Sequence, residues 1–118
     1  SVRAMGNATS QVRCVPEWRQ NSLLPSPPDA PHRVAVVEFN VPGVKNGGSD
    51  KGGDGHRVDS TPIANGVIRA GGACEIIKYF HDRHAEFEKQ VDKYDAFIVR
   101  INPGQLSQGT SPGTQERF

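Results

Sequence analysis

The chain of 118 residues is long enough for one domain with a modest core and too short for a second catalytic domain. Its 14 Lys and Arg residues nearly balance its 13 Asp and Glu residues, and a net charge of +1 creates no field that would attract nucleic acid, so we expect no nucleic-acid partner. No apolar run is long enough to cross a bilayer, which predicts a protein that is soluble or peripheral to a membrane.

Residues 1–31 predict an extended arm, because they show no helical or strand period and end in a cluster of prolines. Such a segment needs a surface to lie against, either its own domain or a partner protein. The expected anchors are its large apolar side chains Val15, Trp18, Leu23 and Leu24. The chain opens with Ser1, which indicates a processed mature form or a piece of a longer chain, and removal of a targeting segment would favour an organelle (chloroplast or mitochondrion).

Residues 32–118 predict one small domain in which strands and helices alternate. In chain order we expect a strand at 33–39, a Gly-rich loop at 40–57, a helix at 60–72, a strand at 73–80, a helix at 81–93 and a strand at 95–101. The first helix has Ser60 or Thr61 as its expected N-cap, and Pro62 in its first turn. Alternation with nearly continuous apolar strands indicates an α/β domain, Rossmann-like and three-layered, with a short parallel sheet.

In a Rossmann-like sheet the first and third strands are neighbours, and a crevice opens at their carboxyl ends. The loops that follow these two strands begin at Asn40 and Asn102. We therefore expect a ligand at this edge, with candidate binding residues Asn40, Arg100, Asn102, Gly104 and Gly109.

Arg100 is the most informative of these residues, because a central strand rarely carries an arginine unless its charge is paired or its end is open. Its guanidinium could bind a carboxylate or a phosphate. It could equally form a salt bridge, for example to Glu38 at the end of the first strand. The sequence leaves both alternatives open.

Two loops look like phosphate-binding loops but depart from the pattern. Residues 104–111 have the glycine spacing of such a loop, yet Thr110 stands where a lysine is needed, which favours a capped loop leading into a helix. Residues 47–55 contain no complete GxGxxG, so we expect a mobile or partner-ordered loop, with weak anion binding as the minority alternative.

Metal chemistry has little support in the sequence, and we expect neither a metal site nor a cofactor. His81 and His84 share one helix face, but no third ligand accompanies them, so packing or capping is the favoured role. Cys14 and Cys74 lack a CxxC spacing, which argues against zinc and against a disulfide framework. Cys74 lies in an apolar run and is expected to be buried.

The segment "YDAFIVRINPGQLSQGTSPGTQERF", with "RVAVVEFN" and "STPIANGVIRAGG", resembles the N-terminal, pre-ATP-grasp domain of glutathione-synthetase-like ATP-grasp proteins. The resemblance spans residues 33–118. It implies a Rossmann-like domain that contributes to substrate binding, with Arg100, Asn102 and Gly104 facing the ligase active site. In that family ATP and magnesium are held by later subdomains, which this chain does not supply.

Two functions from different classes follow. The favoured one is a non-catalytic accessory or structural subunit that docks through its arm and Gly-rich loop onto other protein subunits of a larger complex, for example a photosynthetic or respiratory one. The alternative is the N-terminal substrate-binding domain of an ATP-dependent carboxylate-amine ligase. For this chain alone, a non-enzymatic role is the expectation.

Overall fold

The computed structural model describes residues 22–118, so the predicted anchors Val15 and Trp18, and Cys14 as well, lie outside the described residues. Three parallel strands form one sheet in the order β3-β2-β4, which places the first strand of the alternation beside the third. The predicted α/β class and parallel sheet are confirmed. The helices and strands are β2 (Arg33–Phe39), α1 (Ser60–Arg69), β3 (Ala73–Tyr79), α2 (His84–Val91), β4 (Ala96–Arg100) and α3 (Thr114–Arg117).

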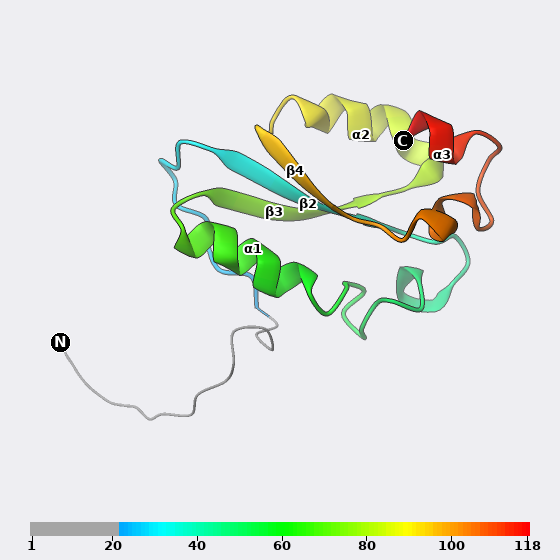
Figure 1. Cartoon of the computed structure of the whole chain (residues 1–118), viewed down its shortest axis with the longest axis horizontal. Coiled ribbons are helices and arrows are strands. Elements are labelled where there is room, and N and C mark those ends of the chain that lie inside the picture. Colours follow the sequence, from blue (N-terminus) through cyan, green and yellow to red (C-terminus); the bar gives the residue numbers. More distant parts are fainter. Residues whose placement is uncertain (1–21) are drawn as a thin grey trace.

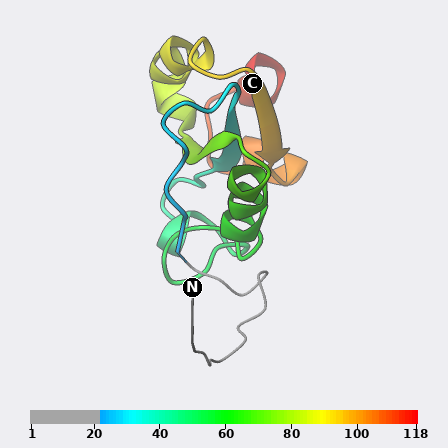
Figure 2. The same cartoon turned by 90° about the vertical axis from the view of Figure 1, so that its left-hand side faces the viewer.

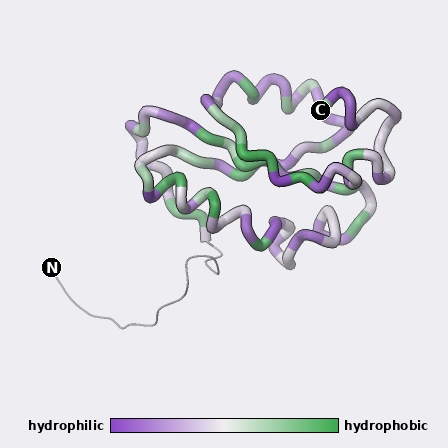
Figure 3. Tube along the Cα trace, viewed as in Figure 1, coloured by the Kyte–Doolittle hydropathy of each residue, from purple (hydrophilic) through white to green (hydrophobic). Residues whose placement is uncertain are grey.

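Helices cover both faces of the sheet: α1 lies on one face, and α2 and α3 lie on the other (Figure 1). Successive residues of β2 pack alternately on the two faces of the sheet. Val36 packs toward α1 with Ala64, Ile68 and Cys74, whereas its neighbours in the strand belong to the opposite core. That second core contains Ala35, Val37, Phe39, Val41, Tyr79 and Leu106. A strand that is buried on both sides is mostly apolar, and the apolar stretch therefore runs through the middle of the molecule (Figure 3).

The two flanking strands differ from the central one in burial. Residues 35–39 of β2 are fully buried, whereas β4, which within residues 22–118 pairs with β2 alone, is only partly covered. Val99 of β4 is 51% exposed. The charged residue of this strand, Arg100, thus lies on an outer strand of the described sheet, where a guanidinium can reach solvent.

The helix boundaries correct two details of the sequence prediction. Asp59, not Ser60 or Thr61, occupies the N-cap position of α1, because the Ser60 hydroxyl donates to the buried carboxylate of Glu38 instead. The second helix is divided into a 3₁₀ turn at His81–Arg83 and an α-helix that ends at Val91.

Residues 22–31 precede β2 without forming a helix or strand (Figure 2), turn at residues 27–30, and are attached to the domain by polar contacts. The side chain of Asn65, which is 0% exposed, accepts a hydrogen bond from the Leu24 amide at 2.8 Å and donates to the Ser22 carbonyl at 3.0 Å. Farther along, the Ser26 hydroxyl accepts from the Cys74 amide at 3.0 Å. Leu24 packs against the α1 core, whereas Leu23 stays 43% exposed.

Cys74 is buried as predicted, and its thiol forms no disulfide. Burial, reinforced by the neighbouring charge of Glu75, raises the pKa of Cys74 to about 11. Because the thiolate is the reactive form, this cysteine behaves as a small apolar core residue. Within residues 22–118, no helix combines the length and the apolar character that crossing a membrane requires.

Gly47 allows a tight turn in the loop after β2, and we expect Gly47→Ala to lower the free energy of unfolding by about 1–3 kcal/mol. Its φ is +88°, and a Cβ there would lie 2.4 Å from Oδ1 of Asn40. Gly53 in the same loop is the matched control, because a Cβ added there meets nothing within 4 Å. Urea denaturation of the two variants tests this, and equal stabilities would contradict it.

Candidate functional site

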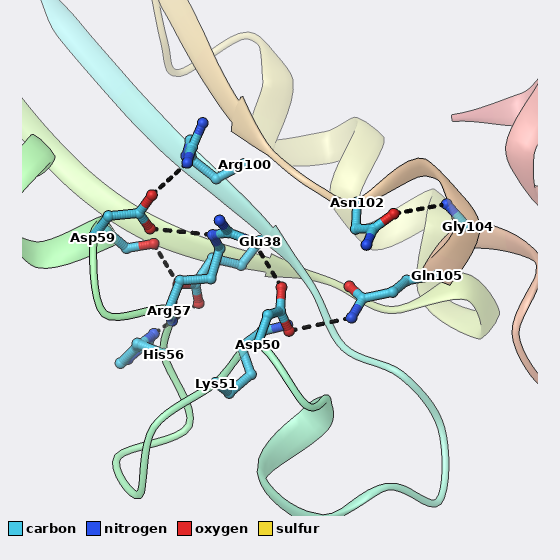
Figure 4. Close-up of polar contacts among 11 residues, drawn as sticks. Glu38, Asp50, Lys51, His56, Arg57, Asp59, Arg100, Asn102, Gly104 and Gln105 are labelled. Atoms are coloured by element: carbon cyan, nitrogen blue, oxygen red, sulfur yellow. Dashed lines mark hydrogen bonds and ion pairs between the residues drawn. The ribbon is translucent and has the colours of Figure 1, made fainter.

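A polar network occupies the carboxyl ends of β2 and β4 and involves four separate segments of the chain (Figure 4). β2 contributes a glutamate, the Gly-rich loop and the approach to α1 contribute most of the charged side chains, β4 contributes an arginine, and the loop after β4 contributes amides. Its residues are Glu38, Asp50, Lys51, His56, Arg57, Asp59, Ser60, Arg100 and Gln105, and Asn102, which bonds to the Gly104 amide, lies nearby.

Glu38 is the buried centre of the network, with a side chain that is 0% exposed. Oε2 accepts a hydrogen bond from the Arg57 amide at 2.7 Å and another from the Ser60 hydroxyl. Oε1 lies 2.8 Å from Nδ1 of His56. Sequence reasoning did not single out this residue as a site residue, although a lone glutamate in the apolar run "RVAVVEF" is a signal for a paired buried charge.

Two arginines of the network donate hydrogen bonds to the same aspartate. Nε of Arg57 donates to Oδ1 of Asp59 at 3.1 Å, and Nη2 of Arg100 donates to Oδ2 of the same carboxylate. Arg57 also donates through Nη1 to Oδ2 of Asp50 at 2.8 Å. The salt bridge that the sequence suggested between Arg100 and Glu38 is therefore wrong in its partner, because the Glu38 carboxylate already accepts hydrogen bonds from α1 and the loop.

The charges of the network shift one another's pKa values. Burial alone would raise the pKa of Asp50 and of Asp59, but hydrogen bonds and charges from neighbouring cations outweigh burial, so both values lie below the ordinary 3.8. Lys51, Gln105 and Arg57 act on Asp50, and the two arginines act on Asp59. The hydrogen bond to Asp59 in turn raises the pKa of Arg57.

The Gly-rich loop is attached to its own domain through Asp50. The Lys51 side chain is 0% exposed, and its ammonium lies 2.7 Å from Oδ1 of Asp50. Nε2 of Gln105, from the loop after β4, donates to the same oxygen at 3.2 Å. Gly48 lies among these groups, where a Cβ would approach Asp50 Oδ1 to 2.8 Å. Contacts within the domain thus hold this loop in place. The sequence had instead predicted a mobile or partner-ordered loop.

An open hollow of about 230 Å³ lies beside the arginine pair. Its lining residues are Arg57, Val99, Arg100, Ile101 and Asn102. Among the described residues, two buried side-chain atoms in this region have no hydrogen-bond partner: Nε of Arg100 and Oε1 of Gln105. The arrangement suits a small anion.

The structure brings together two of the five predicted ligand residues, since Arg100 and Asn102 both line the hollow. The other three are not among its lining residues. The Asn40 amide donates to the Tyr79 carbonyl at 3.0 Å, and the Gly104 amide donates to Oδ1 of Asn102 at 3.1 Å. Gly109 has a φ of +67°, and a Cβ there would contact Pro42. The hollow residues that sequence reasoning missed are Arg57, Val99 and Ile101. Arg57 reaches this position because its amide bonds to Glu38, on the other side of the Gly-rich loop.

The loop after β4 is capped, as the sequence favoured. The side chain of Asn102 caps a 3₁₀ turn at Pro103–Ser107, and the Thr110 hydroxyl donates to the Leu106 carbonyl at 2.6 Å. A hydroxyl committed in this way does not replace the lysine of a phosphate-binding loop.

Both histidines of the second predicted helix have structural partners. Nδ1 of His84 lies 2.6 Å from the Tyr79 hydroxyl, and Nδ1 of His81 lies 3.1 Å from the Ser111 hydroxyl. The ring of His84 also contacts those of Tyr79 and Phe87, in agreement with the packing role favoured for it. His81 instead connects the 3₁₀ turn to Ser111. Across residues 22–118, no cluster of three or more His, Cys, Asp or Glu side chains is placed to hold a metal ion.

Stability should fall at acidic pH through Asp50 and Asp59. Because their folded-state pKa values are lowered, the stability that they contribute is present above about pH 4 and is lost as the pH falls through the folded values. Urea denaturation across acidic pH measures this effect. An Asp50→Asn, Asp59→Asn double variant should give a flatter profile, and an unchanged slope would contradict the assignment.

Comparison with known proteins identifies no relative of this chain: no family model matches it, and neither does a curated protein or a solved structure.

Proposed function

We propose that this domain is a binding module for a small organic carboxylate, held in the hollow at the carboxyl ends of β2 and β4. One observation carries the proposal: guanidiniums from two distant segments, Arg57 and Arg100, are held beside the same hollow by a shared aspartate. A planar guanidinium matches a carboxylate through paired hydrogen bonds. The position is also where open α/β sheets bind ligands.

The composition of the hollow favours a carboxylate over a polyphosphate. Asp50 and Asp59 already offset much of the charge of Arg57 and Arg100, so little net positive charge remains for a highly charged ligand. A small organic acid meets this limit, because its carboxylate brings a single negative charge to an arginine.

The resemblance to the pre-ATP-grasp domain of ATP-grasp ligases supports the same proposal. In that reading, the chain is the N-terminal substrate-binding part of an ATP-dependent carboxylate-amine ligase, and the acid to be activated or joined would bind at Arg100 and Asn102. The nucleotide and magnesium would be supplied by other subdomains.

Butyrate is a suitable first probe, and we expect it to bind with a dissociation constant of roughly 1–10 mM, as befits so small a ligand. Titration into ¹⁵N-labelled protein should shift the resonances of Val99, Ile101 and Asn102 by NMR. Arg100→Gln should weaken binding about tenfold or more, because it removes a charge-assisted hydrogen-bonding group.

Arg33→Gln is the matched control, since Arg33 is an exposed arginine at the opposite end of β2. Its removal changes the net charge equally and should leave the affinity within about twofold. Equal losses of butyrate affinity in both variants would show that the effect comes from net charge alone. Inorganic phosphate binding more tightly than butyrate, or no binding of butyrate at all, would overturn the proposal.

An accessory subunit in a larger complex is the second candidate. The observation that favours it is the outer edge of the sheet, where β4 pairs only with β2 among the described residues and Val99 is 51% exposed. Open strand edges are sites at which another chain can add. Native mass spectrometry of the gently isolated protein tests this candidate: a stable complex that Val99→Lys dissociates would support it, and a monomer would contradict it.

A further inference from the structure

The buried carboxylate of Glu38 holds the backbone of Arg57, and we infer that Glu38 is a positioning residue for the proposed carboxylate site. It fixes Arg57 in the orientation in which this arginine meets the ligand, although Glu38 does not itself line the hollow. The inference rests on the proposed function, because it names what keeps that same site in its binding geometry.

Arg57 is fastened at both of its ends. Its main-chain amide donates to Glu38 Oε2 at 2.7 Å, and its guanidinium donates to Asp50 and Asp59. The two aspartate side chains are 21% and 38% exposed, whereas Glu38 is 0% exposed. The aspartates lie on the loop and at the start of α1, so among the described contacts of Arg57 only the one to Glu38 reaches the central strand of the sheet (Figure 4).

Glu38 also holds the residues on either side of Arg57. His56 precedes it and lies 2.8 Å from Oε1, and the Ser60 hydroxyl donates to Oε2. One buried group thus fixes the whole connection from the Gly-rich loop into α1. A binding arginine held in this way loses little conformational freedom when the ligand arrives, and the entropic cost of binding is correspondingly smaller.

Glu38→Gln tests the inference with almost no change in side-chain volume. The amide has only one acceptor oxygen for the donors that bind the two oxygens of the carboxylate. Butyrate affinity is measured by NMR titration for the wild type, Glu38→Gln, Arg57→Ala and the double variant. We expect Glu38→Gln to weaken binding about five- to tenfold, and to cause no further loss once Arg57 is alanine. An equal loss in the Arg57→Ala background would overturn the inference.

Ser60→Ala separates positioning from general loosening. This variant removes another hydrogen bond of Glu38 while leaving the bond to the Arg57 amide in place. Its butyrate affinity should stay within about twofold of the wild type. A loss as large as that of Glu38→Gln would show that any weakening around Glu38 has the same effect, and would overturn the inference.

Amide hydrogen exchange without ligand distinguishes failure of the proposed carboxylate site from failure of the positioning role of Glu38. It uses the wild-type protein, so it can be carried out even if Glu38→Gln does not fold. The Arg57 amide should exchange slowly, because its acceptor is fully buried. Slow exchange combined with no butyrate binding would overturn the proposed function alone. Fast exchange at Arg57, with the amides of β2 protected, would overturn the positioning role.

Discussion

Replacing Tyr79 with alanine is expected to lower the free energy of unfolding by about 3–5 kcal/mol. Tyr79 is 0% exposed and lies in the core between the sheet and its two C-terminal helices. Its ring centroid lies 6.0 Å from that of Phe39, 5.1 Å from that of Phe87 and 4.6 Å from that of Phe118. Truncation would remove three aromatic contacts and leave a cavity, which the surrounding side chains would fill only in part.

Tyr79→Phe is the control for this prediction, because it keeps the ring and removes only the hydroxyl. That hydroxyl lies 2.6 Å from Nδ1 of His84, and its loss should cost about 1 kcal/mol. Urea denaturation followed by circular dichroism measures both variants. A cost of Tyr79→Phe that matched the cost of Tyr79→Ala would place the stabilisation in the hydrogen bond and contradict the packing argument.

Glu38→Ala should also destabilise the fold by about 3–5 kcal/mol, since removing one partner leaves the others buried without an acceptor. The Arg57 amide, the Ser60 hydroxyl and the His56 ring would all lose their contact with the central strand. The same variant should release the Gly-rich loop, which proteolysis under native conditions would detect as new cleavage after β2.

Glu75→Ala in the neighbouring strand is the matched control. The Glu75 side chain is 52% exposed and lies 3.6 Å from Arg33, so its ion pair is screened by solvent. We expect a cost of about 0–1 kcal/mol. If the two glutamate variants proved equally stable, the central role given to the buried carboxylate would be wrong.

The architecture was predictable because it depends on local patterns. The run "RVAVVEF" and the later apolar segments mark three strands, and the helical stretches between them require parallel pairing with crossovers. The parallel order in turn places the loops after β2 and β4 at one edge. Helix ends were less predictable: the Ser60 hydroxyl had a stronger tertiary acceptor in Glu38 than the local capping role that its position suggested.

The site was predictable only in its position. Arg100 was found because an arginine in an apolar strand is unusual, but its partner depends on where the segment before α1 passes in space. Asp59 and Arg100 are 41 residues apart in sequence, and no local pattern connects them. The same reason hid Arg57 and Glu38, which meet only after the Gly-rich loop has folded back over the end of β2.

The central place of β2 has a consequence for how the chain is made. Among the described strands β2 emerges first during synthesis, yet both of its partners lie far downstream, and the amide of Arg33 is bonded to Asp95 across 62 residues. Contacts of such long sequence separation form slowly, because a large loop must close before they are gained. Until β4 has left the ribosome, the valine-rich β2 lacks one of its two neighbouring strands and its apolar side chains stay partly exposed. During this interval the nascent chain is most prone to aggregation and to chaperone binding.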